Sequence, residues 1–140
     1  MTTLMPVATP GLRVLVAEDA KEYRDVLREE LQRRGFVVTA VEDGAAALEV
    51  FPTQDFDVVL TDLAMPGYNG LQVAQGCKSQ RPDVKVVLLT AWSLLLDDAE
   101  CLEHGVDLVI AKPVLIHSLA AALYEIASNS GRVISPRAML

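Results

Sequence analysis

Four sets of polar residues in this sequence each directly follow a short apolar run with strand character. They are Glu18 and Asp19 after residues 14–17, Asp62 after residues 58–61, Thr90 after residues 86–89, and Lys112 after residues 108–111. The carboxyl ends of the strands in an open parallel sheet border one crevice, where ligands bind. Carboxylates, a hydroxyl and an ammonium in such a crevice are suited to hold a divalent cation and a phosphoryl group.

The elements that must position these groups alternate between strand-like and helix-like segments five times. The predicted strands are residues 12–17, 36–40, 57–61, 85–89 and 107–111. The predicted helices are residues 21–34, 44–51, a segment through Leu71, Ala74 and Cys77 that ends before Pro82, residues 94–104 closed by Gly105, and residues 115–128. This alternation predicts βα units and a parallel sheet with helices on both faces.

Composition favours one soluble domain. The chain has 140 residues, of which 51% are hydrophobic and 22% charged, enough apolar material for a packed core. A formal net charge of −7 argues against a nucleic-acid-binding face. The excess of acidic residues favours solubility in general, and some of these residues could form a metal site.

Cellular location is predicted from what the sequence lacks. Cys77 and Cys101 have no Cys-x-x-Cys spacing, which favours buried structural thiols in a reducing cytosol. No apolar stretch approaches the ~20 residues of a membrane span, and residues 1–11 lack the features of a signal peptide. We expect a cytoplasmic protein with a tail at 1–11, a domain at 12–128 and a second tail at 129–140.

The combined motifs resemble one family. The set Glu18-Asp19, Asp62-Leu-Ala-Met-Pro-Gly, Thr90-Ala91 and Lys112-Pro113 resembles the receiver domain of bacterial two-component response regulators, over residues 12–128. The resemblance implies an α/β fold of the flavodoxin-like, doubly wound type. Its five parallel strands would have the order 2-1-3-4-5, with helices on both faces.

The resemblance also implies a Mg²⁺ site. Its ligands would be Asp19, Asp62 and the backbone carbonyl of Ala64, with Glu18 acting through water. The residues alone leave another interpretation open, because Glu18 and Asp19 precede a helix and could cap it or favour its first turn. Asp19 could serve in both ways.

In the resembled family, the central Asp is the phosphoacceptor. Here Asp62 would take a phosphoryl group from a histidine kinase or a histidine phosphotransfer protein, and Lys112, before a cis Pro113, would neutralise charge. Thr90 would bind a phosphoryl oxygen afterwards and switch the surface of the fourth helix, fifth strand and fifth helix. Considered singly, Asp62 could begin a turn and Thr90 could be an ordinary strand residue.

Three positions depart from the family pattern. Val109 stands where an aromatic residue usually couples to the Thr, and Ala64 has no side chain to position an attacking water. Trp92, the single Trp, follows Thr90 by two residues. We hypothesise that Trp92 overhangs the site and prolongs the phosphorylated state; the alternative is a surface anchor for a partner. The segments 89–92 and 106–109 resemble receivers of hybrid kinases, which favours a phosphorelay.

The function favoured by the sequence is therefore a phosphoacceptor signalling domain, with slow autodephosphorylation rather than an enzyme's turnover. A pseudo-receiver that only binds protein is the main alternative. An Asp-nucleophile hydrolase is disfavoured because Ala64 stands where its second acid is needed. The run 94–96 is either core or interaction surface. Homodimerisation is compatible with the sequence, and we expect no contact with nucleic acid or membrane.

Overall fold

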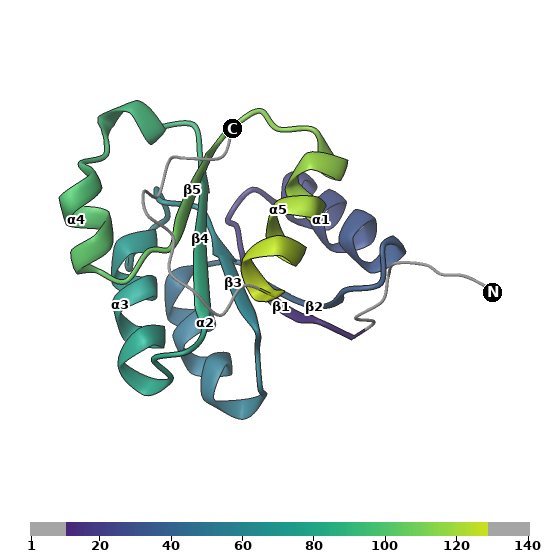
Figure 1. Cartoon of the computed structure of the whole chain (residues 1–140), viewed down its shortest axis with the longest axis horizontal. Helices are drawn as coiled ribbons and strands as arrows, with labels where there is room; N and C mark the ends of the chain where they lie inside the picture. Colours follow the sequence, from purple (N-terminus) through teal and green to yellow (C-terminus); the bar gives the residue numbers. More distant parts are fainter. Residues whose placement is uncertain (1–10, 129–140) are drawn as a thin grey trace.

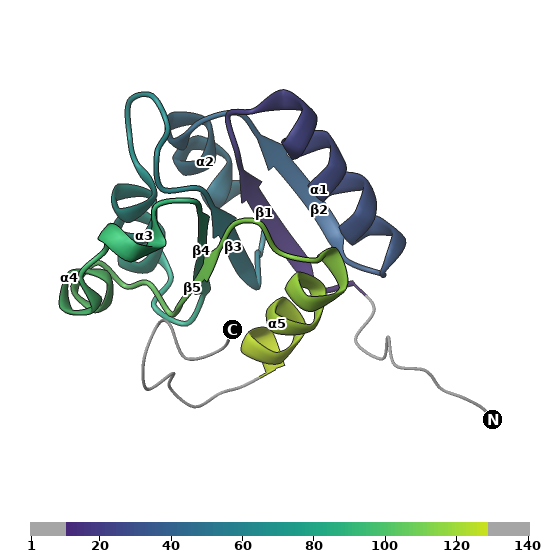
Figure 2. The same cartoon turned by 90° about the horizontal axis from the view of Figure 1, so that it is seen from above.

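The central sheet has five parallel strands in the order β2-β1-β3-β4-β5, as predicted (Figures 1 and 2). The computed structural model describes residues 11–128. The strands are β1 Arg13–Ala17, β2 Val37–Val41, β3 Val58–Thr61, β4 Lys85–Thr90 and β5 Leu108–Ala111. The helices are α1 Lys21–Arg33, α2 Gly44–Val50, α3 Gly70–Gln80, α4 Asp98–Glu103 and α5 Ile116–Ser128, with 3₁₀ turns η1 Phe51–Thr53 and η2 Ser93–Leu95.

Helices cover both faces of the sheet because each central strand is apolar on both sides. Strand side chains alternate between faces, so Leu15 and Val59 pack with α2, α3 and α4, whereas Val14 and Leu60 pack with α1 and α5. Figure 2 shows this division, with α1 and α5 on one face and α2, α3 and α4 on the other. Cys77 and Cys101 are buried free thiols in the first of these cores, as predicted.

The register brings the carboxyl ends of the strands level with one another. Ala17 pairs with Thr61 across β1 and β3, and Thr90 pairs with Ala111 across β4 and β5. Each polar residue singled out in the sequence lies at, or directly after, one of these paired ends. The sheet therefore presents them along a single edge.

The fourth helix differs from its prediction. Residues 94–104 were expected to be helical throughout, but the α-helix is limited to Asp98–Glu103 and follows the short turn η2. Asp97 caps the helix by accepting a hydrogen bond from the Ala99 N–H at 3.4 Å. Before it, Leu96 is extended and packs against the core, while Leu95 is 77% exposed. The apolar run is thus divided between core and surface.

The start of α1 corrects a second interpretation. Its N-cap residue is Ala20, which offers no side-chain cap, so Asp19 is not the cap. The Glu18 carboxylate instead accepts a hydrogen bond from the Ala20 N–H at 3.1 Å, one residue ahead of the helix. Among residues 11–128, no helix is long and apolar enough to cross a membrane.

Candidate functional site

Three carboxylates meet at the carboxyl edge of the sheet. Oxygen atoms of Glu18, Asp19 and Asp62 all lie within 4.8 Å of one another. The adjacency of β1 and β3 brings them together, since the Asp62 N–H donates to the Ala17 carbonyl at 3.0 Å, one residue before Glu18. Glu18 is buried, Asp62 is mostly buried and Asp19 is exposed, so the cluster opens to solvent on the Asp19 side.

Lys112 is the counterion of this cluster. Its Nζ donates to Glu18 Oε1 at 3.0 Å and to Asp62 Oδ2 at 3.2 Å. At the end of β5, the Lys112 N–H donates to the Thr90 carbonyl at 3.0 Å, and the Lys112–Pro113 peptide is cis, as the family resemblance implied. Burial alone would lower the pKa of Lys112, but the Glu18 hydrogen bond and the Asp62 charge outweigh it and raise that pKa.

The negative charge of the carboxylates exceeds the positive charge that Lys112 supplies. Burial raises the pKa of Glu18 above 4.5, although the Ala20 N–H and Lys112 oppose this shift. With all groups ionised, three carboxylates face one ammonium, an excess of two negative charges. Small hard divalent cations such as Mg²⁺ take carboxylate oxygens as ligands and leave other positions to water. The donor set therefore fits Mg²⁺.

The segment after Asp62 is held tightly. Leu63 donates its N–H to Asp62 Oδ1 at 2.6 Å, and the Gly70 N–H, at the start of α3, donates to the Leu63 carbonyl at 2.9 Å. A β-carbon on Gly70 would collide with the Asp62 carbonyl oxygen, so only glycine fits this approach. The sequence analysis missed Gly70; a glycine directly after the helix cap Asn69 was the available signal. Ala64 is exposed in the same segment.

Thr90 reaches the edge but makes a local contact. It is fully buried, and its Oγ1 accepts a hydrogen bond from the Trp92 N–H at 3.1 Å. Trp92 is 53% exposed and precedes η2. Val109 is buried in the core formed with α2, α3 and α4. The structure thus gathers Glu18, Asp19 and Asp62 in one cluster. Lys112 is in direct contact with Glu18 and Asp62, and Thr90 lies at the end of the adjacent strand.

A residue missed in the sequence lies against Lys112. The Tyr23 ring centroid is 4.7 Å from Lys112 Nζ, and both residues line a cavity of about 250 Å³ with Ala20, Pro113 and Val114. Tyr23 lies on the same face of α1 as Leu27 and Leu31, the face that packs against the sheet. The signal available in the sequence was the position of Tyr23 in the first turn of the helix that follows the acid pair.

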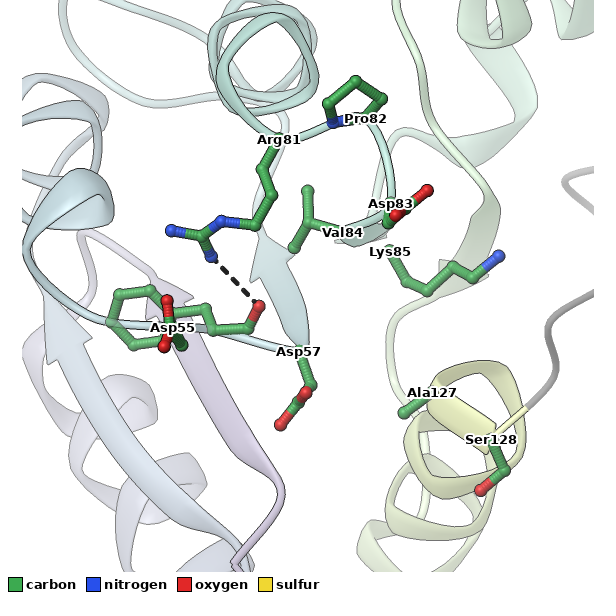
Figure 3. A pocket seen from close by; sticks show the side chains of 10 residues that line it. Asp55, Asp57, Arg81, Pro82, Asp83, Val84, Lys85, Ala127 and Ser128 are labelled. Atoms are coloured by element: carbon green, nitrogen blue, oxygen red, sulfur yellow. Dashed lines mark hydrogen bonds between the residues drawn. The ribbon is translucent and has the colours of Figure 1, made fainter.

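A larger cavity lies at the opposite, amino-terminal edge of the sheet (Figure 3). It has a volume of about 600 Å³ and is lined by Asp57 and Lys85, which flank the starts of β3 and β4, and by the end of α5. Arg81 projects into it and donates to the Phe56 carbonyl at 3.2 Å (Figure 3). It contains none of the residues predicted for the site.

The fold, the acid cluster and its lysine together define a class of protein. The sequence pattern of the response regulator receiver domain matches residues 14–124. The chain belongs to this family, the receiver domains of two-component signalling systems.

Individual relatives agree with this assignment. The sensory transduction protein RegX3 of Mycobacterium tuberculosis is 35% identical over 84% of this chain, which spans about half (52%) of that protein. The response regulator TrrA of Thermotoga maritima, solved in complex with Mg²⁺ and BeF, is 32% identical. Its TM-score is 0.75, with coverage of 81% of this chain and 97% of that one.

A third relative is the receiver domain of the sensor histidine kinase PA1611 from Pseudomonas aeruginosa, which has a magnesium ion in its active-site cleft. It is 28% identical with a TM-score of 0.77, and the match covers 85% of this chain and 99% of that one.

Proposed function

We propose that this chain accepts a phosphoryl group on Asp62, with Mg²⁺ bound, from a histidine kinase or a histidine phosphotransfer protein. The contact between Asp62 Oδ2 and Lys112 Nζ, at 3.2 Å inside a largely buried acid cluster, carries the proposal. It places a nucleophilic oxygen beside a fixed cation, as phosphoryl transfer requires. The Mg²⁺-bound relatives TrrA and PA1611 support the choice of metal.

Glu18, Asp19, Asp62 and the Ala64 carbonyl are the proposed metal-binding groups, with Glu18 acting through water. When bound, Mg²⁺ would supply charge neutralisation at the phosphoryl oxygens. Glu18 is the buried member of the cluster, and its hydrogen bond from Ala20 fixes its orientation. Asp19 is the exposed member and provides the entry side.

Asp62 is the nucleophile in this proposal. Its Oδ2 forms a bond to phosphorus while the bond from phosphorus to the donor's imidazole nitrogen breaks, and the nitrogen keeps the electron pair. The Leu63 N–H on Oδ1 leaves Oδ2 as the attacking oxygen. Lys112 then transfers its hydrogen bond from Oδ2 to a phosphoryl oxygen, a charge-assisted contact that stabilises the acyl phosphate.

Thr90 is the proposed switch residue. Its hydroxyl now accepts from the Trp92 N–H, and binding a phosphoryl oxygen would require it to turn toward Asp62. That exchange alters the turn that carries Trp92 and η2, so modification of Asp62 changes the surface ahead of α4. Ala91 is small and leaves room for the phosphoryl group.

Hydrolysis of the phosphorylated state should be slow. Ala64 has no side-chain donor or acceptor to orient a water for attack on phosphorus. The domain would therefore hold its phosphoryl group as a signal, with only slow autodephosphorylation. Trp92 at the edge of the site would slow the water further.

The proposed output surface is the face formed by α4, β5 and α5. Leu102 is 51% exposed on α4, Leu115 is 67% exposed just before α5, and Leu95 is exposed at the end of η2, ahead of α4. Apolar side chains of this size at a surface favour a protein partner. The net charge of −7 disfavours nucleic acid as that partner. We propose a cytoplasmic setting for this exchange.

The test is Mg²⁺-dependent labelling with acetyl phosphate, read by intact mass, on the native chain and on Asp62→Asn. A single phosphate-sized gain in mass on the native chain, absent from the variant, is the expected result. If no gain occurs with acetyl phosphate or with a phosphohistidine donor, while Trp92 fluorescence shows that Mg²⁺ binds, the proposal is wrong. The chain would then be a pseudo-receiver.

A further inference from the structure

We infer that Tyr23 is a positioning residue for Lys112: its ring holds the ammonium at the site when the carboxylates turn to a metal. The inference rests on the proposed function and adds a residue that the family motifs do not include. It starts from one contact in the structure, the 4.7 Å between Lys112 Nζ and the Tyr23 ring centroid. That distance lies within the range at which an aromatic ring attracts a cation.

The contact follows from the way α1 begins. The helix starts at Lys21, directly after Glu18, Asp19 and Ala20, so the side chain of its third residue lies beside the acid cluster. The cis peptide after Lys112 and the following Pro113 and Val114 form the other wall of the same small cavity. Tyr23 is half-buried and packs against the core shared by α1 and α5, which fixes the position of its ring.

Without metal, the ammonium of Lys112 has three attractions: Glu18 at 3.0 Å, Asp62 at 3.2 Å and the ring. A divalent cation bound by Asp62, and by Glu18 through water, would neutralise both carboxylates and weaken their hold on Lys112. The ring is neutral and does not ligate a hard cation, so its attraction for the ammonium would remain. Tyr23 thus keeps the ammonium near Asp62 at the stage when it must bind the incoming phosphoryl group.

The chemistry of the ring separates this role from simple packing. Tyr23→Phe keeps the π face and the volume, whereas Tyr23→Leu keeps an apolar side chain but removes the π face. The same change at Tyr124, which packs against the same core from α5, is the matched control. We expect Tyr23→Leu to slow labelling by acetyl phosphate at saturating Mg²⁺ by roughly 3- to 10-fold, the size of one partly buried cation–π contact. Tyr23→Phe and Tyr124→Leu should label at the native rate.

A second measurement does not depend on phosphorylation. The ring current of Tyr23 should displace the NMR signals of the Lys112 ε-methylene protons upfield in the native chain and in Tyr23→Phe, with and without Mg²⁺. The displacement should be absent in Tyr23→Leu. An upfield signal that disappears when Mg²⁺ is added would overturn the inference, and so would labelling of Tyr23→Leu as fast as the native chain. A native chain that accepts no phosphoryl group would instead defeat the proposed function.

Discussion

Replacing Lys112 by Met should destabilise the metal-free protein and tighten its binding of Mg²⁺. Lys112 Nζ donates hydrogen bonds at 3.0 Å to Glu18 and at 3.2 Å to Asp62, whose side chains are 3% and 11% exposed. A hydrogen bond to a charged group contributes about 1.5–3 kcal/mol. Two such bonds amount to about 3–6 kcal/mol. We expect a loss at or just below the low end of that range, about 2–3 kcal/mol in the free energy of unfolding, because Glu18 keeps its bond from Ala20 and can take up a proton.

Metal should partly reverse this loss. Removal of a positive charge beside the carboxylates should tighten Mg²⁺ binding on the order of 10-fold. Under saturating Mg²⁺ that gain adds about 1.4 kcal/mol to the stability of the variant relative to the native chain. The deficit should also shrink on acidification, because Glu18, whose pKa is raised by burial, becomes protonated and no longer needs a counterion. The Lys112→Met chain should nevertheless be labelled far more slowly than the native chain.

The assay is urea unfolding followed by circular dichroism, in EDTA and in excess Mg²⁺, with Lys78→Met as the matched control. Lys78 is as buried as Lys112, with side chains 22% and 21% exposed, and it pairs with Asp107 at 2.9 Å away from the acid cluster. Its loss should cost about 1 kcal/mol or less and should not respond to Mg²⁺. The account of the site is refuted if Lys112→Met matches the native stability in EDTA, or if Mg²⁺ widens its deficit.

Two further predictions concern the same edge of the sheet. Because burial raises the pKa of Glu18 above 4.5, protons should compete with Mg²⁺, so its affinity should fall as the pH drops through that raised value. For the same reason Glu18 stabilises the metal-free fold below pH 4.5, and this contribution is lost as the pH rises through the raised pKa. Calorimetric titration with Mg²⁺ at several pH values tests the first point; an affinity that stays constant down to pH 4.5 would contradict it. Trp92→Ala should lose its phosphoryl group faster than the native chain, and equal decay by intact mass would show that Trp92 does not shield the site.

Most of the fold was predictable because it depends on local and strongly periodic signals. The five strands are apolar on both faces, and the boundaries predicted for them shift by a single residue. Pro52 prevents α2 from continuing, because a proline cannot extend an α-helix, and the chain passes into the 3₁₀ turn η1. The sheet order came from the family resemblance, since periodicity does not determine which strands are neighbours.

The site was predictable in its members but not in its contacts. Glu18, Asp62 and Lys112 are adjacent because the carboxyl ends of parallel strands lie along one edge of the sheet. The sequence alone predicts this adjacency, since each residue follows a predicted strand. Their present pairing is not a local property, because it depends on which counterion is bound. Thr90 shows the same limit: its type was informative, but its hydrogen bond to the Trp92 N–H depends on the backbone of the following turn.

The wrong predictions concern segments in which a tertiary contact overrides a weak local preference for helix or for a cap. Residues 94–97 have good helix formers, yet Leu96 adopts an extended conformation and packs against the core. That burial delays the helix until Asp97 can cap it. Asp19 looked like a cap from its position, but Glu18 makes the hydrogen bond to Ala20 and leaves Asp19 exposed at the acid cluster.

In the proposed function the same ammonium holds two successive positions, and this explains why one lysine can serve a site with three acids. In the metal-free state Lys112 neutralises part of an excess negative charge that would otherwise destabilise the fold. In the proposed function, a divalent cation would take over that neutralisation and leave the ammonium available for a phosphoryl oxygen. Stability without metal and reactivity with metal therefore depend on one side chain, so a substitution that improves the first without keeping the charge must abolish the second.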